Sequence, residues 1–159
     1  SYEEKAVGER IRREFSARGI EAERVDVLQG VDLRSEHLAM YDRVDIALDC
    51  FPFNGATTTF EALFMGVPVV TLLGQRLAGR YAASLLRSIG FDACIASSES
   101  DFLARAVELA SDVDRLAQYR TALRDIVMSS RLCNGQRYTR NLERLYRAMW
   151  RRWCVDSGP

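Results

Sequence analysis

Residues 54 to 72 read NGATTTFEALFMGVPVVTL, and this stretch decides the fold class. An Asn-Gly turn precedes three threonines, an apolar helical pattern, and then Gly-Val-Pro before an apolar run. The pattern predicts a helix from about Thr58 to Met65 and a strand over 68–73. Threonine is a mediocre helix former, so three in succession indicate that their hydroxyls or backbone amides have a use.

Helix-like and strand-like segments alternate on both sides of this stretch. Further helices are predicted over 3–18, 35–43, 78–89, 97–111, 112–128 and 135–153, and further strands over 25–28, 44–51 and 93–96. Ser98 is expected to cap its helix, whose core-facing residues are Phe102, Ala106, Leu109 and Ala110. Such alternation is typical of an α/β fold, a parallel sheet flanked by helices.

Composition sets the class of protein. The 159 residues suffice for one domain with a core, and the formal net charge is zero, which favours no polyanionic partner. No apolar run approaches the roughly 20 residues of a membrane span, and the charged opening residues do not resemble a signal peptide. We therefore expect a cytoplasmic protein that binds neither membrane nor nucleic acid. The arginines between Arg115 and Arg152 are interpreted as a solvated or interface-facing surface.

The residues that commonly bind metals are few. Four cysteines lie far apart without a C-x-x-C pair, and His37 is the single histidine. These residues are too few and too far apart to suggest a metal site, so the sequence predicts reduced thiols and no metal site.

The last helix carries a wide apolar stripe. Its members recur at helical spacing: Tyr138, Leu142, Leu145, Tyr146, Met149, Trp150 and Trp153. Such a stripe most often faces the core, but near a terminus it equally suits a surface that a missing partner domain covers.

The loop after the central strand is the candidate binding site. Ligands of parallel α/β sheets bind beyond the carboxyl ends of the strands. Gly55 permits close approach of the backbone, and the helix start offers unpaired amides and a positive dipole end that suit a phosphate. The alternative is local: Thr58 and Glu61 have the spacing of a capping box. Both interpretations remain open on residue chemistry alone.

Two acids flank the central strand. Asp45 and Asp49 share one face of it by the two-residue period. We interpret Asp49, near the strand end, as an acid that positions the loop and not as a catalytic group.

The motifs also resemble a known family. The stretch VDIALDCFPFNGATTTFEALFMGVPVVTLLGQRLAGRYAASLLRSIG, followed by RYTRNLERLYRAMW, looks like the C-terminal half of the catalytic region of O-GlcNAc transferases. It is more similar still to their bacterial and SPINDLY-type relatives, which carry tetratricopeptide repeats. The likeness covers roughly Glu4 to Trp153. It implies the second of two facing Rossmann-like domains (the GT-B type), with 1–159 as one nucleotide-sugar-binding domain and 134–153 as a long amphipathic helix.

The resemblance also implies roles for single residues. His37 matches a nucleobase contact, as does Arg34, where the family usually has lysine; Glu61 matches a ribose contact. Arg80 suits a phosphate or sugar contact or, equally, a surface salt bridge. The residues expected at the diphosphate are Asn54, Gly55, Thr57, Thr58 and Thr59.

This sequence departs from the family in places. Ala56 stands where animal relatives have a histidine, and Met40 where they have an arginine. The first strand of the domain, the facing catalytic domain and the repeats are expected before Tyr2.

The sequence thus predicts the nucleotide-sugar-binding half of an inverting glycosyltransferase. It would transfer N-acetylglucosamine from UDP to a protein Ser or Thr hydroxyl without a metal, and the fragment alone is expected to be inactive. The alternative is a non-catalytic nucleotide-sensing or scaffolding domain of a repeat protein. Arginine at 21 positions against a single lysine, Lys5, hints at a GC-rich bacterial genome.

Overall fold

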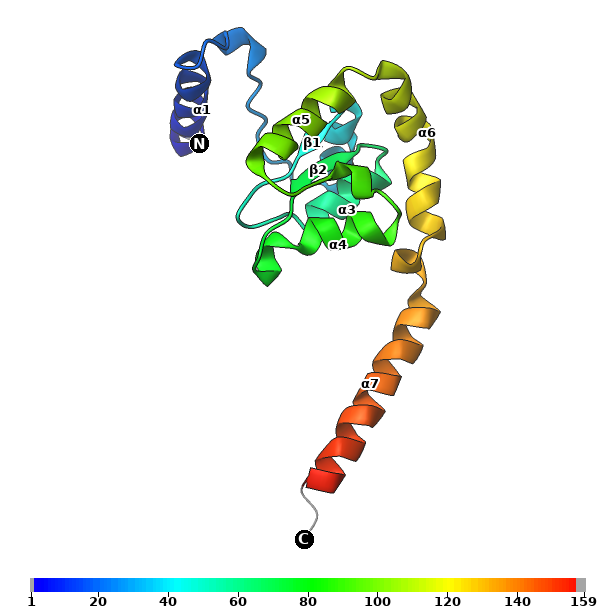
Figure 1. The fold of residues 1–159 in the computed structure, drawn as a ribbon. Helices are drawn as coiled ribbons and strands as arrows, with labels where there is room; N and C mark the ends of the chain where they lie inside the picture. The colour runs from blue at the N-terminus through cyan, green and yellow to red at the C-terminus, as the bar shows by residue number, and fades with distance from the viewer. Residues whose placement is uncertain (1, 157–159) are drawn as a thin grey trace. The chain divides into compact units, whose positions relative to one another are not determined.

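The chain divides into two compact units, residues 1–37 and 38–159. The computed structural model describes residues 2–156. Among these, β-strands occur only in the second unit, which also contains most of the helices (Figure 1).

The first unit is built around α1 (Tyr2–Ser16) and the short 3-10 helix η1 (Ala22–Arg24). The predicted N-terminal helix is therefore confirmed. The strand predicted over 25–28 is wrong, because backbone groups at its start are used elsewhere. The Val25 amide donates to the Ala22 carbonyl at 3.1 Å, and the Val25 carbonyl accepts from Nε of Arg12 at 3.2 Å.

The second unit contains a three-stranded parallel sheet in the order β1-β2-β3. The strands are β1 (Ala47–Leu48), β2 (Val69–Leu72) and β3 (Ile95–Ala96). Each lies within a predicted segment, but β1 is much shorter than the predicted 44–51. Side chains take the carbonyls at both ends of that segment: Arg120 donates to Val44, and Nδ2 of Asn54 donates to Cys50.

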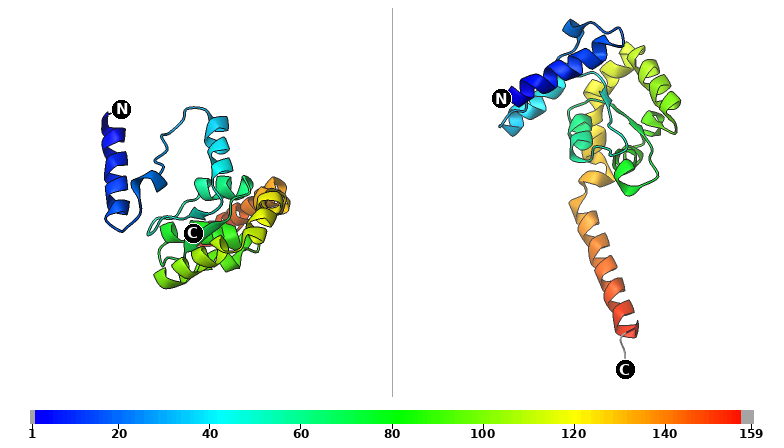
Figure 2. Two further views of the ribbon diagram at one scale, coloured as in Figure 1. Left: turned by 90° about the horizontal axis from the view of Figure 1, so that it is seen from above. Right: turned by 90° about the vertical axis from the view of Figure 1, so that its left-hand side faces the viewer.

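Helices cover both faces of this sheet. α5 (Glu99–Ala110) lies on one face, while α3 (Thr57–Phe64) and α4 (Tyr81–Ser88) lie on the other (Figure 1). The right-hand view of Figure 2 shows the strands between α3 and α5. The remaining elements, in chain order, are α2 (Arg34–Ala39), η2 (Met40–Arg43), η3 (Leu77–Gly79), η4 (Asp92–Cys94), α6 (Val113–Ser129), η5 (Arg131–Cys133) and α7 (Gly135–Asp156).

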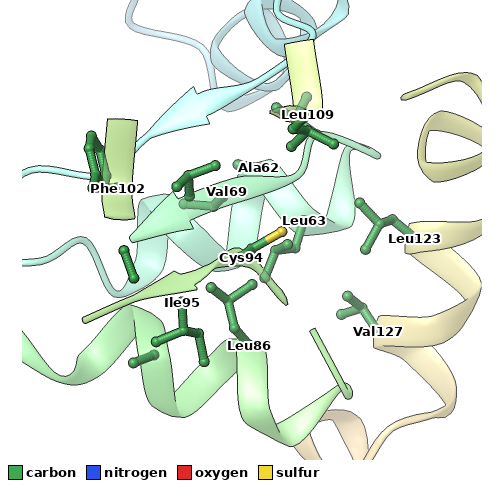
Figure 3. Close-up of a cluster of buried hydrophobic side chains, with 14 residues drawn as sticks. Ala62, Leu63, Val69, Leu86, Cys94, Ile95, Phe102, Leu109, Leu123 and Val127 are labelled. Carbon is green, nitrogen blue, oxygen red and sulfur yellow. The ribbon is translucent and has the colours of Figure 1, made fainter. Parts of the chain in front are cut away.

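One apolar core joins these layers (Figure 3). Leu63 of α3 and Leu86 of α4 are fully buried, as is Leu123 of α6. On α5, Phe102 and Leu109 face the core and Ser98 caps the helix, as predicted, and Ala106 is half-buried. The prediction that Ala110 faces the core is wrong; it is exposed where α5 ends and the chain turns toward α6.

A single guanidinium holds α6 against the connections around the sheet. Nη1 of Arg120 donates to the carbonyls of Tyr41 and Met65, each at 3.2 Å, and Nη2 donates to Val44. The backbone of Arg120 also packs on Gly66, whose φ is +82°. The turn after α3 and the entry to β1 are therefore positioned by the same residue of α6.

Helix α7 exposes its apolar stripe. Each of its two tryptophans is about three-fifths exposed, their rings stack with centroids 5.1 Å apart, and no residue of the helix is buried. The stripe therefore does not face the core of the described chain. No described helix, α7 included, is long and apolar enough to cross a membrane.

We expect Gly66→Ala to destabilise the protein more than Gly90→Ala. Both glycines have a left-handed φ, +82° and +78°, which costs an L-residue about 1–2 kcal/mol. A Cβ on Gly66 would also lie 2.6 Å from the Arg120 carbonyl oxygen, whereas nothing lies within 4 Å of a Cβ on Gly90. Urea unfolding of both variants measures the difference. Equal losses would contradict a role for close packing at Gly66.

Candidate functional site

Helix α3 begins without a side-chain cap. Its N-cap is Ala56, which has no side chain able to accept from the first-turn amides, and Phe60 N donates to Ala56 O at 3.0 Å. The alternative of a capping box, with Thr58 as N-cap and Glu61 as its partner, is wrong: the N-cap is Ala56, two residues earlier, so Thr58 lies within the first turn of α3. By contrast, Ser98 and Asp112 accept amides at the starts of α5 and α6.

The three threonines occupy that uncapped first turn. Thr57 and Thr58 are exposed, while Thr59 is buried with 3% of its surface accessible. A Cβ on Gly55 would lie 2.7 Å from the hydroxyl oxygens of both Thr58 and Thr59. Only glycine allows the loop to pass this close to the hydroxyls.

Asp49 ties this loop to the sheet. Its Oδ1 accepts from the Gly55 amide at 2.8 Å, and its Oδ2 accepts from the Thr71 hydroxyl of β2 at 2.6 Å. The interpretation of Asp49 as an acid that positions the loop is confirmed. The Gly55 amide points at this carboxylate, so Gly55 contributes close backbone approach to the site while its N–H is already used.

Asn54 anchors the same loop from inside. Asn54 is fully buried. Its backbone amide donates to the Ala78 carbonyl and its side-chain Nδ2 to the Cys50 carbonyl, both at 2.9 Å. Its Oδ1 is buried without a hydrogen-bond partner among the described residues. The structure therefore places Asn54 beneath the loop, while Thr57 and Thr58 are exposed at the helix start.

A pocket of about 180 Å³ opens where these elements meet, at the carboxyl end of β1. Asp49, Gly55, Thr58 and Thr59 all contribute to its wall. The other lining residues are Tyr41, Ala47, Leu48, Cys50, Ala62 and Val69.

Tyr41 is a residue of this pocket that the sequence did not indicate. Its hydroxyl donates to the Thr58 carbonyl at 3.3 Å. Burial raises the pKa of Tyr41, and the nearby Glu61 carboxylate raises it further. The spacing of Tyr41 from Leu38 suits the inner face of a helix and carries no signal for contact with α3, which is distant in the chain.

The predicted ribose and base contacts lie in different units. Glu61 is half-buried on α3, one turn after Thr58 and close enough to Tyr41 to affect its pKa. Arg34 and His37 lie one turn apart on α2, within the first unit, so they share a helix face.

Arg80 lies in a separate groove. Its Nη1 donates to the Gly74 carbonyl at 3.2 Å. The groove, of about 520 Å³, is also lined by Arg87 and Arg131 and does not include the threonines. The structure thus does not bring Arg80 into the pocket at α3.

The thiols and acids form no metal cluster in the part of the chain that the structure describes. All four cysteines are free. Burial raises the pKa of the Cys94 thiol, which lies in the core.

Tyr41→Phe should cost stability at neutral pH and less at alkaline pH. The variant loses the hydrogen bond to Thr58, worth about 1 kcal/mol. The pKa of Tyr41 is raised on folding, so the unfolded phenol ionises first, and wild-type stability falls as the pH rises above about 10. The variant lacks this loss. Urea unfolding at about pH 8 and pH 11 measures the difference in free energy of unfolding between the wild type and the variant. The same difference at both pH values would contradict a raised pKa of Tyr41 in the folded protein.

Comparison with known proteins places this chain in a family. The pattern described as "Glycosyl transferase family 41" matches residues 4–142. In Solanum lycopersicum, the probable UDP-N-acetylglucosamine--peptide N-acetylglucosaminyltransferase SPINDLY is 43% identical over 141 residues, which are 89% of this chain and 15% of that protein. In Caenorhabditis elegans, a UDP-N-acetylglucosamine--peptide N-acetylglucosaminyltransferase is 33% identical over 150 residues, 94% of this chain and 13% of that protein.

A solved structure shows the same fold. A mutant of the O-GlcNAc transferase of Thermobaculum terrenum matches with a TM-score of 0.85 and 37% identity, over 96% of this chain and 29% of that one. The predicted α/β, GT-B-type fold class is confirmed by this likeness and by the parallel strands. The chain spans only 15% of the length of the SPINDLY relatives that it matches. The family match covers most of its own residues, and the chain therefore belongs to glycosyl transferase family 41.

Proposed function

We propose that this chain is the nucleotide-sugar-binding part of an inverting glycosyltransferase, which transfers N-acetylglucosamine from UDP-N-acetylglucosamine to Ser or Thr hydroxyls of proteins. The observation that carries the proposal is the uncapped start of α3, where Thr57 and Thr58 are exposed beside a pocket at the carboxyl end of β1. The names of the relatives supply the donor and the acceptor class.

The proposed chemistry is stabilisation of the leaving group. As the glycosidic bond breaks, the β-phosphate of UDP gains negative charge. First-turn amides of α3 and the hydroxyls of Thr57 and Thr58 oppose that charge, aided by the positive end of the helix dipole. The acceptor hydroxyl attacks from the opposite face of the sugar, and any general base comes from the facing domain or the substrate.

The remaining contacts follow the order of the ligand. Glu61, next along α3 from the diphosphate, would accept hydrogen bonds from the ribose hydroxyls. Arg34 and His37 would contact the nucleobase. Thr59, Gly55 and the buried Asn54 would shape the diphosphate site from beneath.

The donors at α3 are already numerous, so we propose that transfer requires no metal. A chelator would then leave turnover unchanged. The full-length protein is proposed to be a bacterial, cytoplasmic repeat protein, in which this chain alone has no turnover.

The exposed stripe of α7 has a place in this proposal. Side chains such as Tyr146, Met149 and Trp150, each about three-fifths exposed, would pack against the facing catalytic domain. A helix with no buried residue and a continuous apolar face gains stability only when a partner covers it.

Ala56→Asp tests anion binding at the start of α3. Aspartate at the N-cap should stabilise the helix, so lost binding cannot be ascribed to unfolding. Its charge should weaken UDP binding by about tenfold or more, because it opposes the diphosphate at the same amides. Ala56→Asn, a neutral cap of the same size, should weaken it less. Calorimetry of the full-length protein measures both.

Uridine serves as the control ligand, since it has no phosphate, and its affinity should be the same in both variants. Undiminished UDP binding by Ala56→Asp would contradict the proposed diphosphate site.

Turnover separates the transferase from a nucleotide sensor. Thr58→Ala should lower kcat of the full-length enzyme by about a hundredfold if the hydroxyl stabilises the leaving group. Thr121→Ala, which alters an exposed threonine of α6, is the matched control and should retain turnover. A wild-type protein that binds UDP but transfers no sugar to any acceptor would favour the sensor.

A further inference from the structure

The loop before α3 is held by a carboxylate whose two oxygens have different partners. Oδ1 of Asp49 accepts from the Gly55 amide at 2.8 Å and Oδ2 accepts from the Thr71 hydroxyl at 2.6 Å. Thr71 is fully buried in β2, and Asp49 itself follows β1 directly. One side chain, at the end of β1, therefore joins β2 to the loop.

The position of Gly55 is transmitted to the threonines. The hydroxyls of Thr58 and Thr59 pack so closely over Gly55 that a Cβ there would approach each of them to 2.7 Å. Gly55 also lies only two residues before Thr57, the first residue of α3. A displacement of Gly55 would consequently displace the first-turn amides and hydroxyls with it.

We propose that Asp49 is a positioning residue of the diphosphate site, which holds the uncapped first turn of α3 open toward the ligand. This rests on the proposed function. A side-chain cap would secure the helix start by occupying its amides. Asp49 instead holds the residue before the N-cap, so the loop is fixed while the amides of Thr57 and Thr58 stay available.

The hydrogen bonds of Asp49 would favour ligand binding by positioning the loop, whereas its negative charge would oppose it. Asp49→Asn separates these two effects. Asp49 lines the pocket, where its negative charge opposes an anionic ligand. Asparagine can keep both contacts: its Oδ1 accepts from Gly55, and its Nδ2 donates to the oxygen of Thr71. Asp49→Asn therefore preserves the hydrogen bonds to Gly55 and Thr71 without the negative charge, whereas Asp49→Ala removes both the hydrogen bonds and the charge.

The first arm of the test is independent of ligand. Amide hydrogen exchange is measured at Phe60, whose N–H donates to the Ala56 carbonyl at 3.0 Å, and at the next amides of α3, in the full-length protein without nucleotide. We expect Asp49→Ala to accelerate exchange there by about tenfold, and Asp49→Asn to stay near the wild type. Asp125→Ala is the matched control, because it removes an exposed carboxyl of α6 that does not line the pocket. Unchanged protection in Asp49→Ala would overturn the proposal.

The second arm measures UDP affinity in the same proteins. Asp49→Ala should weaken UDP binding by about tenfold, which corresponds to about 1.4 kcal/mol, while Asp49→Asn should bind at least as tightly as the wild type. A merely structural role would lower the melting temperature but leave the affinity of the folded protein unchanged. Wild-type affinity in Asp49→Ala would contradict the role of Asp49 alone. A wild-type protein that fails to bind UDP would contradict the proposed function and, with it, the ligand named here.

Discussion

The guanidinium of Arg120 constrains both segments that frame the site. It binds the carbonyls of Tyr41 and Val44 before β1 and of Met65 after α3, so a residue of α6 determines where these connections lie. Tyr41 in turn donates to the Thr58 carbonyl in the first turn of α3. Because the pocket wall is built from these segments, its shape depends on packing across the core as well as on the loop itself.

The start of α3 lacks the side-chain cap that would stabilise the helix, and its first-turn amides are left accessible to a ligand. Helices α5 and α6 satisfy first-turn amides with Ser98 and Asp112, whereas α3 begins at Ala56 with no such cap. The loop is secured by the tie from Asp49 to Gly55 instead. Unpaired amides at a helix start form an anion site when a ligand completes them, which is the physical basis of the proposed diphosphate contact.

The exposed faces are consistent with a chain that covers a small share of its relatives' length. The apolar stripe along α7 leaves a surface that a longer protein can bury. The proposed base contacts at Arg34 and His37 also lie in the first unit, while the threonines lie in the second.

Local patterns in the sequence are sufficient to predict the fold class and the family. Alternating helical and strand patterns around NGATTTFEALFMGVPVVTL suffice for a parallel α/β sheet, because periodicity and the turn residues Asn54, Gly55 and Gly66 act locally. Local patterns also predicted the cap at Ser98.

Other features of the fold depend on contacts between segments that are distant in the chain. The capping box at Thr58 has the right spacing, yet the helix begins at Thr57 because the loop is held from Asp49 and β2. Residues 25–28 have a strand-like pattern, but their backbone pairs with no strand in the described chain. Tyr41 lines the pocket through contacts with distant segments, because Arg120 donates to its carbonyl and its hydroxyl donates to the Thr58 carbonyl. Hydrogen bonds between distant segments are not encoded in any local pattern, and they decide the geometry of this site.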